Sequence, residues 1–280
     1  MNKIHIGRVE IGENTPLTLI GGPCAIESKE HSLEMCDKIK EITDKLKIQY
    51  IFKSCFNKDC RSSIKSFHGI GMEAGLNILN EVKKTYDVPV TTDVSNVAWM
   101  KDAAEVADMI QIPAYLSRQT HLLVAAGETG KAVNIKKGQF LSPEQMLNAA
   151  MKVKSTGNEN ILLTDRGTFF GYNNLVNDMR CFHIMKQSGY PTCYDATHSI
   201  QLPASLVTHS GGKRQYIPPL SRAAISAGAN SIFMEIHDKP NMALCDSKSQ
   251  LNIKYLEELL IQIKAVYDLV QKMDEIKYEQ

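Results

Sequence analysis

The sequence predicts an α/β fold, a (β/α)₈ barrel preceded by a short β-hairpin. Three observations support this prediction: eight short aliphatic or β-branched runs recur along the 280 residues, segments of helical period separate them, and the runs are apolar on both faces, as buried parallel strands are. An open doubly wound sheet is the alternative. We expect one domain over residues 1–280, with the hairpin at 1–14 covering the barrel floor and the barrel at 15–275.

The expected strands are four or five residues long and alternate with the expected helices. Parallel strands need such a crossover, because the chain must return to the starting edge of the sheet before the next strand begins. The strands are expected over 17–21, 48–52, 88–92, 108–112, 132–135, 160–163, 190–194 and 231–234, and the clearest helical periods lie over 35–46, 175–185 and 253–263.

Helix boundaries are marked by residues that suit helix ends. Ser142, Pro143 and Gln145 have the pattern of an N-cap, a first-turn proline and a capping-box partner. Gly189 and Gly228 are expected just beyond helix ends, because glycine readily adopts the left-handed conformation that ends a helix. These signals predict a helix that starts near residue 143 and two that end shortly before the glycines.

Composition and charge exclude several classes of protein. With 32 Lys and Arg against 31 Asp and Glu, the formal net charge is +1, which offers no basic surface for nucleic acid or anionic lipid. The apolar runs are far shorter than the ~18 residues of a membrane span, and the first residues lack the apolar core of a secretory signal, so we expect a cytoplasmic protein. The seven cysteines lack paired zinc-finger spacing and are expected to be reduced thiols.

Polar and charged residues follow nearly every expected strand, at the end of the barrel where active sites of this fold lie. Six cations would meet there, and they would repel one another unless ligands with more than one phosphate or carboxylate balanced them. Each cation alone could instead be a solvated loop charge. The six are Lys53, Lys58, Arg61, Arg118, Lys136 and Arg166.

A possible metal site is indicated at the same end of the barrel. Cys24 follows the first strand, His198 follows the seventh, Glu235 follows the eighth, and Asp246 stands in the loop beyond. One thiolate, one imidazole and two carboxylates are a plausible ligand set for zinc, iron(II) or manganese. The alternative is that the cysteine is a small buried hydrophobic residue and the histidine is structural.

Several strings of the sequence together resemble one enzyme family. The strings are GGPCAIES, KSxFxKxxRSSIKSF, IQIPAYLSRQT, VNIKKGQFLSP, DRGTFFGYNNLVNDMR, YDATHSIQLP, GGKRQYIPPLSRAA and FMEIHDKPNMALCD. By these strings the chain resembles the 3-deoxy-D-manno-octulosonate 8-phosphate synthases, also called 2-dehydro-3-deoxyphosphooctonate aldolases, from about residue 17 to about residue 265.

The resemblance implies a transferase that condenses phosphoenolpyruvate with D-arabinose 5-phosphate and releases phosphate, making a precursor of lipopolysaccharide. It also implies a cytoplasmic homotetramer. By the same resemblance, phosphoenolpyruvate is bound by Lys53, Lys136 and Arg166, with Gln111 and Tyr115 beside it.

The implied aldose site includes two departures from the family pattern. Lys58 lies between the two substrates as a proton donor, and Asp93 stands near the aldose as a further catalytic residue. Asn57 replaces an aspartate and Cys60 an asparagine, so we expect weaker recognition of the aldose hydroxyls. The same resemblance implies that Arg61 and Ser62 form the site of the aldose phosphate.

Family members divide into a metal-dependent class with cysteine after the first strand and a metal-independent class with asparagine there. Cys24 places the chain with the former, and His198, Glu235 and Asp246 match its other ligands. The expected cofactor is a divalent metal, one of zinc, iron(II), manganese or cobalt. His198 is also expected to reach the phosphate side of the substrate and to act in catalysis.

Three alternative functions remain open at this point. A related synthase would use erythrose 4-phosphate to make the shikimate precursor, but its family carries a Lys-Pro-Arg type sequence where this chain has Lys58 and Arg61-Ser62. A zinc aldolase that cleaves sugar phosphates needs several histidine ligands. A non-catalytic barrel would have no physical need to keep mutually repelling cations together.

Overall fold

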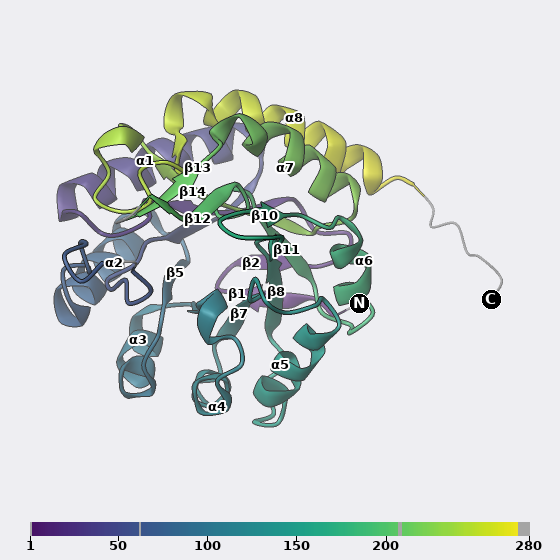
Figure 1. Cartoon of the computed structure of the whole chain (residues 1–280), viewed down its shortest axis with the longest axis horizontal. Helices are drawn as coiled ribbons and strands as arrows, with labels where there is room; N and C mark the ends of the chain where they lie inside the picture. The colour runs from purple at the N-terminus through teal and green to yellow at the C-terminus, as the bar shows by residue number, and fades with distance from the viewer. Residues whose placement is uncertain (1, 62, 207–208, 274–280) are drawn as a thin grey trace.

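The chain folds into a closed parallel barrel surrounded by helices (Figure 1). The computed structural model describes residues 2–61, 63–206 and 209–273. Each barrel strand is hydrogen-bonded to its neighbours, and the last strand pairs with both the preceding strand and the first, which closes the ring. The predicted (β/α)₈ barrel is confirmed, and the ring closure excludes the open doubly wound sheet.

All eight predicted barrel strands are present in the structure. Seven of them end one to three residues later than predicted, because each continues through one or more residues, Gly22 in β3 and a polar residue in the other six, that were placed in the following loop. The strands are β3 (Thr18–Gly22), β4 (Gln49–Lys53), β5 (Val90–Asp93), β6 (Met109–Ile112), β7 (Ala132–Lys136), β8 (Ile161–Asp165), β11 (Thr192–Asp195) and β14 (Ser231–His237).

The helices follow the strands and pack their apolar faces against the outside of the barrel. Short 3₁₀ helices precede several of them or shape the loops. The α-helices are α1 (Lys29–Leu46), α2 (Met72–Tyr86), α3 (Met100–Val106), α4 (Thr120–Glu128), α5 (Gln145–Lys154), α6 (Arg180–Lys186), α7 (Ile217–Ser226) and α8 (Leu256–Val270). The 3₁₀ helices are η1 (Val97–Trp99), η2 (Ala114–Leu116), η3 (Arg214–Tyr216), η4 (Pro240–Met242) and η5 (Ile253–Tyr255).

The helix-end signals are confirmed in part. Gly189 and Gly228 follow α6 and α7 with φ angles of 85° and 101°. The Gln145 side chain accepts a hydrogen bond from the Ser142 backbone N–H at 3.1 Å, which is half of the predicted capping box. However, α5 begins at Gln145 and not at Pro143, because the preceding turn has hydrogen bonds of 3₁₀ spacing.

The helix predicted over 175–185 is wrong at its start. The chain first forms a hairpin of β9 (Thr168–Phe169) and β10 (Leu175–Val176), and α6 begins only at Arg180. The helical spacing misled here because an apolar residue of a short strand happened to lie in phase with the helix. A second unpredicted hairpin, β12 (Gln201–Leu206) with β13 (His209–Gly212), lies in the loop after β11, and β15 (Leu251–Asn252) pairs with β14.

The N-terminal hairpin is confirmed and covers one end of the barrel. Its strands β1 (Ile4–Ile6) and β2 (Val9–Ile11) pair antiparallel. Their apolar side chains pack with the lowest inward-facing residues of the barrel, including Ile51 and Phe233. This contact seals the barrel floor, so ligands can enter only from the opposite mouth.

A polar layer lies directly above this apolar floor. Side chains two residues apart on a strand point to the same face, so each floor residue is followed on the inside by the residue two positions later. On six strands that second residue is polar and buried. The pairs are Ile51 and Lys53, Met109 and Gln111, Ala132 and Asn134, Leu162 and Thr164, Cys193 and Asp195, and Phe233 and Glu235. No helix among the described residues is long and apolar enough to cross a membrane.

Candidate active site

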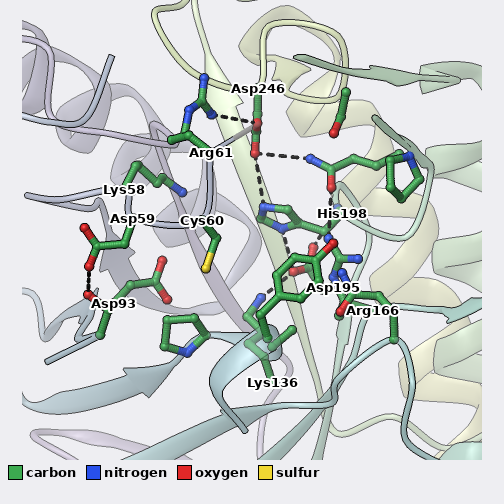
Figure 2. A pocket seen from close by; sticks show the side chains of 18 of the residues that line it. Lys58, Asp59, Cys60, Arg61, Asp93, Lys136, Arg166, Asp195, His198 and Asp246 are labelled. Carbon is green, nitrogen blue, oxygen red and sulfur yellow. Dashed lines mark hydrogen bonds and ion pairs between the residues drawn. The ribbon is translucent and has the colours of Figure 1, made fainter. Parts of the chain in front are cut away.

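A cavity of about 210 Å³ opens at the carboxyl ends of the barrel strands (Figure 2). Its wall contains most of the residues that the sequence predicted, together with several that it did not. The predicted residues on the wall are Asn57, Lys58, Cys60, Arg61, Asp93, Gln111, Tyr115, Lys136, Arg166, His198 and Asp246.

Four predicted residues lie elsewhere. Lys53 is fully buried beneath the cavity wall. Arg118 is exposed, does not line the cavity, and accepts a hydrogen bond from Lys152 of α5 through its backbone carbonyl. The prediction that six cations meet at the mouth is therefore wrong for Arg118, because its loop turns outward after β6. Cys24 and Glu235 are buried behind the wall, and Ser62 lies outside the described residues.

His198 is held in one orientation by Asp195 at the end of β11. The Asp195 carboxylate lies 2.7 Å from His198 Nδ1 and also accepts the His198 backbone N–H at 2.9 Å. With a proton on Nδ1, the other ring nitrogen, Nε2, presents a lone pair 3.5 Å from both Glu235 and Asp246. A carboxylate that orients a histidine in this way is typical of metal sites.

Glu235 is a buried carboxylate with one oxygen engaged and the other free. Its Oε1 is 2.9 Å from Lys53 Nζ and 3.4 Å from Lys58 Nζ. Its Oε2 is buried and has no hydrogen-bond partner. A buried oxygen without a hydrogen-bond partner is unfavourable, so this atom is suited to contact a bound cation or a further hydrogen-bond donor.

Two groups of ligand atoms share Asp246. His198, Glu235 and Asp246 place their ligand atoms within 4.8 Å of one another, and so do Cys24, Cys245 and Asp246. The four predicted metal ligands are therefore gathered at one place, although not as a single set of mutually close atoms. Cys245 was not predicted to be there.

The pKa values at this centre show how strongly the buried charges interact. Burial works to lower the pKa of His198, but the negative charges of Asp195 and Glu235 raise it above its ordinary value. Burial works to raise the pKa of Asp246, and its hydrogen bond with His198 contributes to lowering it to about 2. Burial raises the pKa of Cys24 well above its ordinary value, so a thiolate there needs a bound cation.

One side of the cavity is built to receive an anion. Lys136 forms a short ion pair with Asp195, and its Nζ lies 3.3 Å from the centre of the Phe233 ring. Arg166 donates from Nη2 to Gln201 Oε1 at 2.9 Å, while its buried Nη1 has no partner. Gln201 Nε2 in turn donates to Asp246 at 3.1 Å, which links the anion side to the metal ligands.

The opposite side is formed by the loop after β4 (Figure 2). Although burial works to lower the pKa of Lys58, its electrostatic interactions with Cys24, Cys55 and Glu235 raise it well above its ordinary value. Arg61 donates to Asp246 at 3.4 Å. Asp59 accepts hydrogen bonds from Asn57 and Ser95, so the Asn57 amide is engaged within the loop and does not point freely at a ligand.

Asp93 and Cys60 complete this side. Asp93 accepts hydrogen bonds from Cys55 at 2.8 Å and Gln111 at 2.5 Å. Burial works to raise the pKa of Asp93, but the charges of Lys53 and Lys58 lower it, which keeps the carboxylate ionised. The Cys60 thiol points into the cavity, as Figure 2 shows.

Sequence reasoning assigned no role in the site to three residues that shape it, Asp195, Gln201 and Cys245, although Asp195 was recognised as a polar residue at the end of the seventh strand. Asp195 had a readable signal, because it is a charged residue two positions after an inward-facing residue of a buried strand. Gln201 and Cys245 had none, since a glutamine in a loop and a single cysteine are common in any protein. Their neighbours are distant in sequence and are revealed only by the fold.

The comparisons with known proteins agree with one another. A sequence model of the DAHP synthetase I family matches residues 2–272. A 2-dehydro-3-deoxyphosphooctonate aldolase of Geotalea uraniireducens is 48% identical over 271 residues, which is 97% of this chain and 100% of the relative. Proteins of the same name are 48% identical in Citrifermentans bemidjiense, over 96% of this chain and 99% of the relative, and 47% identical in Protochlamydia amoebophila, over 97% and 99%.

Proposed function

The chain belongs to the DAHP synthetase I family, and on that premise we propose that it condenses phosphoenolpyruvate with D-arabinose 5-phosphate and water. The products are 3-deoxy-D-manno-octulosonate 8-phosphate, a lipopolysaccharide precursor, and phosphate. The chain is an enzyme of the transferase type, like the relatives that share this name. Their shared name favours this reaction over the one that uses erythrose 4-phosphate.

One observation carries the proposal: four cations and two of the candidate metal ligands, His198 and Asp246, line the same cavity. Lys136 and Arg166 stand on one side, Lys58 and Arg61 on the other, and the ligand atoms around Asp246 lie between them. Two anionic substrates bound to the two sides would therefore meet beside the metal centre. Holding both reactants in this geometry lowers the entropic barrier of the condensation.

We propose that phosphoenolpyruvate binds on the side of Lys136 and Arg166. The unpartnered Nη1 of Arg166 is available to a phosphate or carboxylate oxygen. Gln111 lies on the wall, and Tyr115 is half exposed at the rim. Lys53 is too deeply buried to reach a ligand in the cavity in this conformation, so it supports the site through Glu235.

The aldose phosphate is proposed to bind on the side of Arg61, with Lys58 next to the aldehyde. In the reaction, C3 of phosphoenolpyruvate forms a bond to the aldehyde carbon, and the aldehyde oxygen takes a proton, for which Lys58 is the proposed donor. Water adds to C2, and the bond between C2 and the phosphate oxygen breaks. The negative charge of Glu235, whose Oε1 lies 3.4 Å from Lys58 Nζ, helps to keep Lys58 charged before this transfer, and Asp93 is proposed to stand near the aldose as a further catalytic residue.

The residues present fit a divalent metal. Glu235 Oε2 has no hydrogen-bond partner among the described residues, and His198 Nε2 lies 3.5 Å from the other oxygen of the same carboxylate, Oε1. We propose Cys24, His198, Glu235 and Asp246 as the ligands, with zinc, iron(II), manganese or cobalt as the ion. When bound, the ion would orient and polarise the water or the aldehyde.

The reaction is tested by following phosphate release from phosphoenolpyruvate with a panel of four- and five-carbon aldose phosphates. We expect arabinose 5-phosphate to give the highest kcat/KM. Faster turnover of erythrose 4-phosphate, or none with any sugar, would contradict the proposal. Arg166→Met should raise the KM for phosphoenolpyruvate, whereas Arg180→Met should not, because Arg180 is exposed and pairs only with its neighbour Asp178 in the described structure.

Metal dependence is tested separately by removing the metal with a chelator and adding divalent ions back. Turnover should be lost and then restored, and full activity in protein shown to be metal-free would contradict this part of the proposal. We further propose a cytoplasmic homotetramer, on the resemblance alone. Light scattering of the purified protein measures the number of subunits.

A further inference from the structure

We propose that Cys245 is a second thiolate ligand of the metal centre, so that the centre prefers a soft ion such as zinc over manganese. The inference rests on the metal dependence proposed above. It concerns this chain's own residues, because Cys245 lies beside two predicted ligands, Cys24 after β3 and Asp246 in the loop after β14.

The position of Cys245 is the first observation. Its Sγ, the Cys24 Sγ and a carboxylate oxygen of Asp246 all lie within 4.8 Å of one another. Asp246 belongs also to the group with His198 and Glu235, so an ion held by Asp246 is within reach of both sulfurs. Both cysteines are buried and neither is in a disulfide.

The two cysteine-bearing loops are held together by a buried glutamine. Gln250 accepts the backbone N–H of Cys24 at 3.2 Å and donates to the backbone carbonyl of Cys245 at 2.8 Å. Glu27 adds a second link by accepting the backbone N–H of Leu244 at 2.9 Å. The relative position of the two sulfurs is therefore set by the backbone before any ion binds, which lowers the entropic cost of forming the site.

A hydrogen bond fixes the position of the Cys245 sulfur. The part-buried Arg61 donates from Nη1 to Cys245 Sγ at 2.9 Å. The simpler explanation, that Cys245 only fills space as a small hydrophobic residue, gives no reason for this donor to approach the sulfur.

The chemistry predicts a preference among ions. Thiolates are soft ligands that select zinc and related ions, whereas carboxylate and water ligands suit manganese and magnesium. Two thiolates with the imidazole of His198 would give zinc three strong ligands and leave further positions for a carboxylate, water or substrate. With Cys24 as its only thiolate ligand, the centre would discriminate less strongly between zinc and manganese.

The proposal is tested by counting the sulfur ligands of the loaded, full-length protein. Zinc X-ray absorption on the unmodified protein should show two sulfurs at about 2.3 Å. After cobalt loading, Cys245→Ser should lower the thiolate-to-cobalt charge-transfer absorption to about half, in proportion to the thiolates that remain. Cys36→Ser is the matched control, because Cys36 lies on the buried face of α1, away from the proposed ligands, and its substitution should leave the absorption unchanged.

Affinity gives an independent measurement. Cys245→Ser should weaken zinc binding by about tenfold or more and change manganese binding much less. A single sulfur in the unmodified protein, or an absorption lost in Cys24→Ser but unchanged in Cys245→Ser, would overturn the proposal and leave the metal centre intact. If the unmodified protein binds neither zinc nor cobalt, the proposed metal dependence fails and this inference fails with it.

Discussion

Gln201 offers the sharpest test of how the anion side and the metal ligands are connected. Its side chain is buried, accepts from Arg166 at 2.9 Å and donates to Asp246 at 3.1 Å. Gln201→Leu keeps the approximate size of the side chain and removes both contacts. Arg166 and Asp246 would then be free to move apart or to reorient.

The magnitude follows from the two lost hydrogen bonds. Each joins an amide to a charged group, and such bonds contribute ~1.5 to 3 kcal/mol. Loss of both at the lower value is about 3 kcal/mol, which corresponds to a fall of roughly 100-fold in kcat/KM. We expect the fall to include a higher KM for phosphoenolpyruvate through Arg166 and weaker metal binding through Asp246.

The assay combines steady-state kinetics with metal titration of the Gln201→Leu protein. Gln262→Leu is the matched control, because Gln262 also accepts from an arginine, Arg222 at 2.7 Å, but does so between the outer helices. The control should keep its kinetics within about twofold. If Gln201→Leu folds normally and keeps both its kcat/KM and its metal affinity, the bridge has no functional role and the reasoning is wrong.

Four further predictions each concern one or two residues. Cys60→Asn should lower the KM for arabinose 5-phosphate about three- to tenfold, because an amide supplies a neutral hydrogen bond of ~0.5 to 1.5 kcal/mol that a thiol does not. An unchanged KM in steady-state kinetics would show that the side chain at position 60 does not contact the sugar. Without metal, the protein should be most stable to urea between about pH 4 and 6.5. The lowered pKa of Asp246 contributes stability that is lost as the pH falls toward about 2. The raised pKa of His198 contributes stability that is lost as the pH rises through the pKa of the folded state. Metal occupancy should fall in mild acid, because a proton on His198 competes with the metal for the same ring nitrogen. Occupancy that is constant from pH 8 to 5.5 would contradict the role of His198 as a ligand. Gly22→Ala should unfold the protein at markedly lower temperature, because an added Cβ would lie 2.2 Å from the Lys53 carbonyl oxygen; a melting temperature equal to that of the unmodified protein would refute this.

Local sequence patterns predicted the barrel well, and their errors have identifiable causes. The eight strands were found because apolar residues recur in short runs. Their ends were placed too early because Lys53, Asp93, Asp195 and other polar residues within the last strand positions look like loop residues. Inside a barrel such residues are tolerated at the end of a strand, since they face one another across the mouth and form ion pairs.

The candidate ligands Cys24, His198, Glu235 and Asp246 were also predictable, because each follows a strand and all strands of a parallel barrel end at the same mouth. Their roles stay predictions until they are tested, as do those of the substrate-binding residues. Lys53 and Arg118 show the limit of this reasoning. A position after a strand says which end of the barrel a residue occupies, but whether its side chain points into the cavity, beneath it or outward depends on the loop.

The sequence by itself determined the alternation of strands and helices, the polar mouth and the family resemblance, because periodicity and motifs are properties of neighbouring residues. Only the tertiary structure decided which distant residues touch. Cys24 and Cys245 are more than two hundred positions apart, and they meet because β14 pairs with β3 to close the ring. The two cysteines lie close together because the barrel closes and because the Gln250 side chain hydrogen-bonds to the backbone of both.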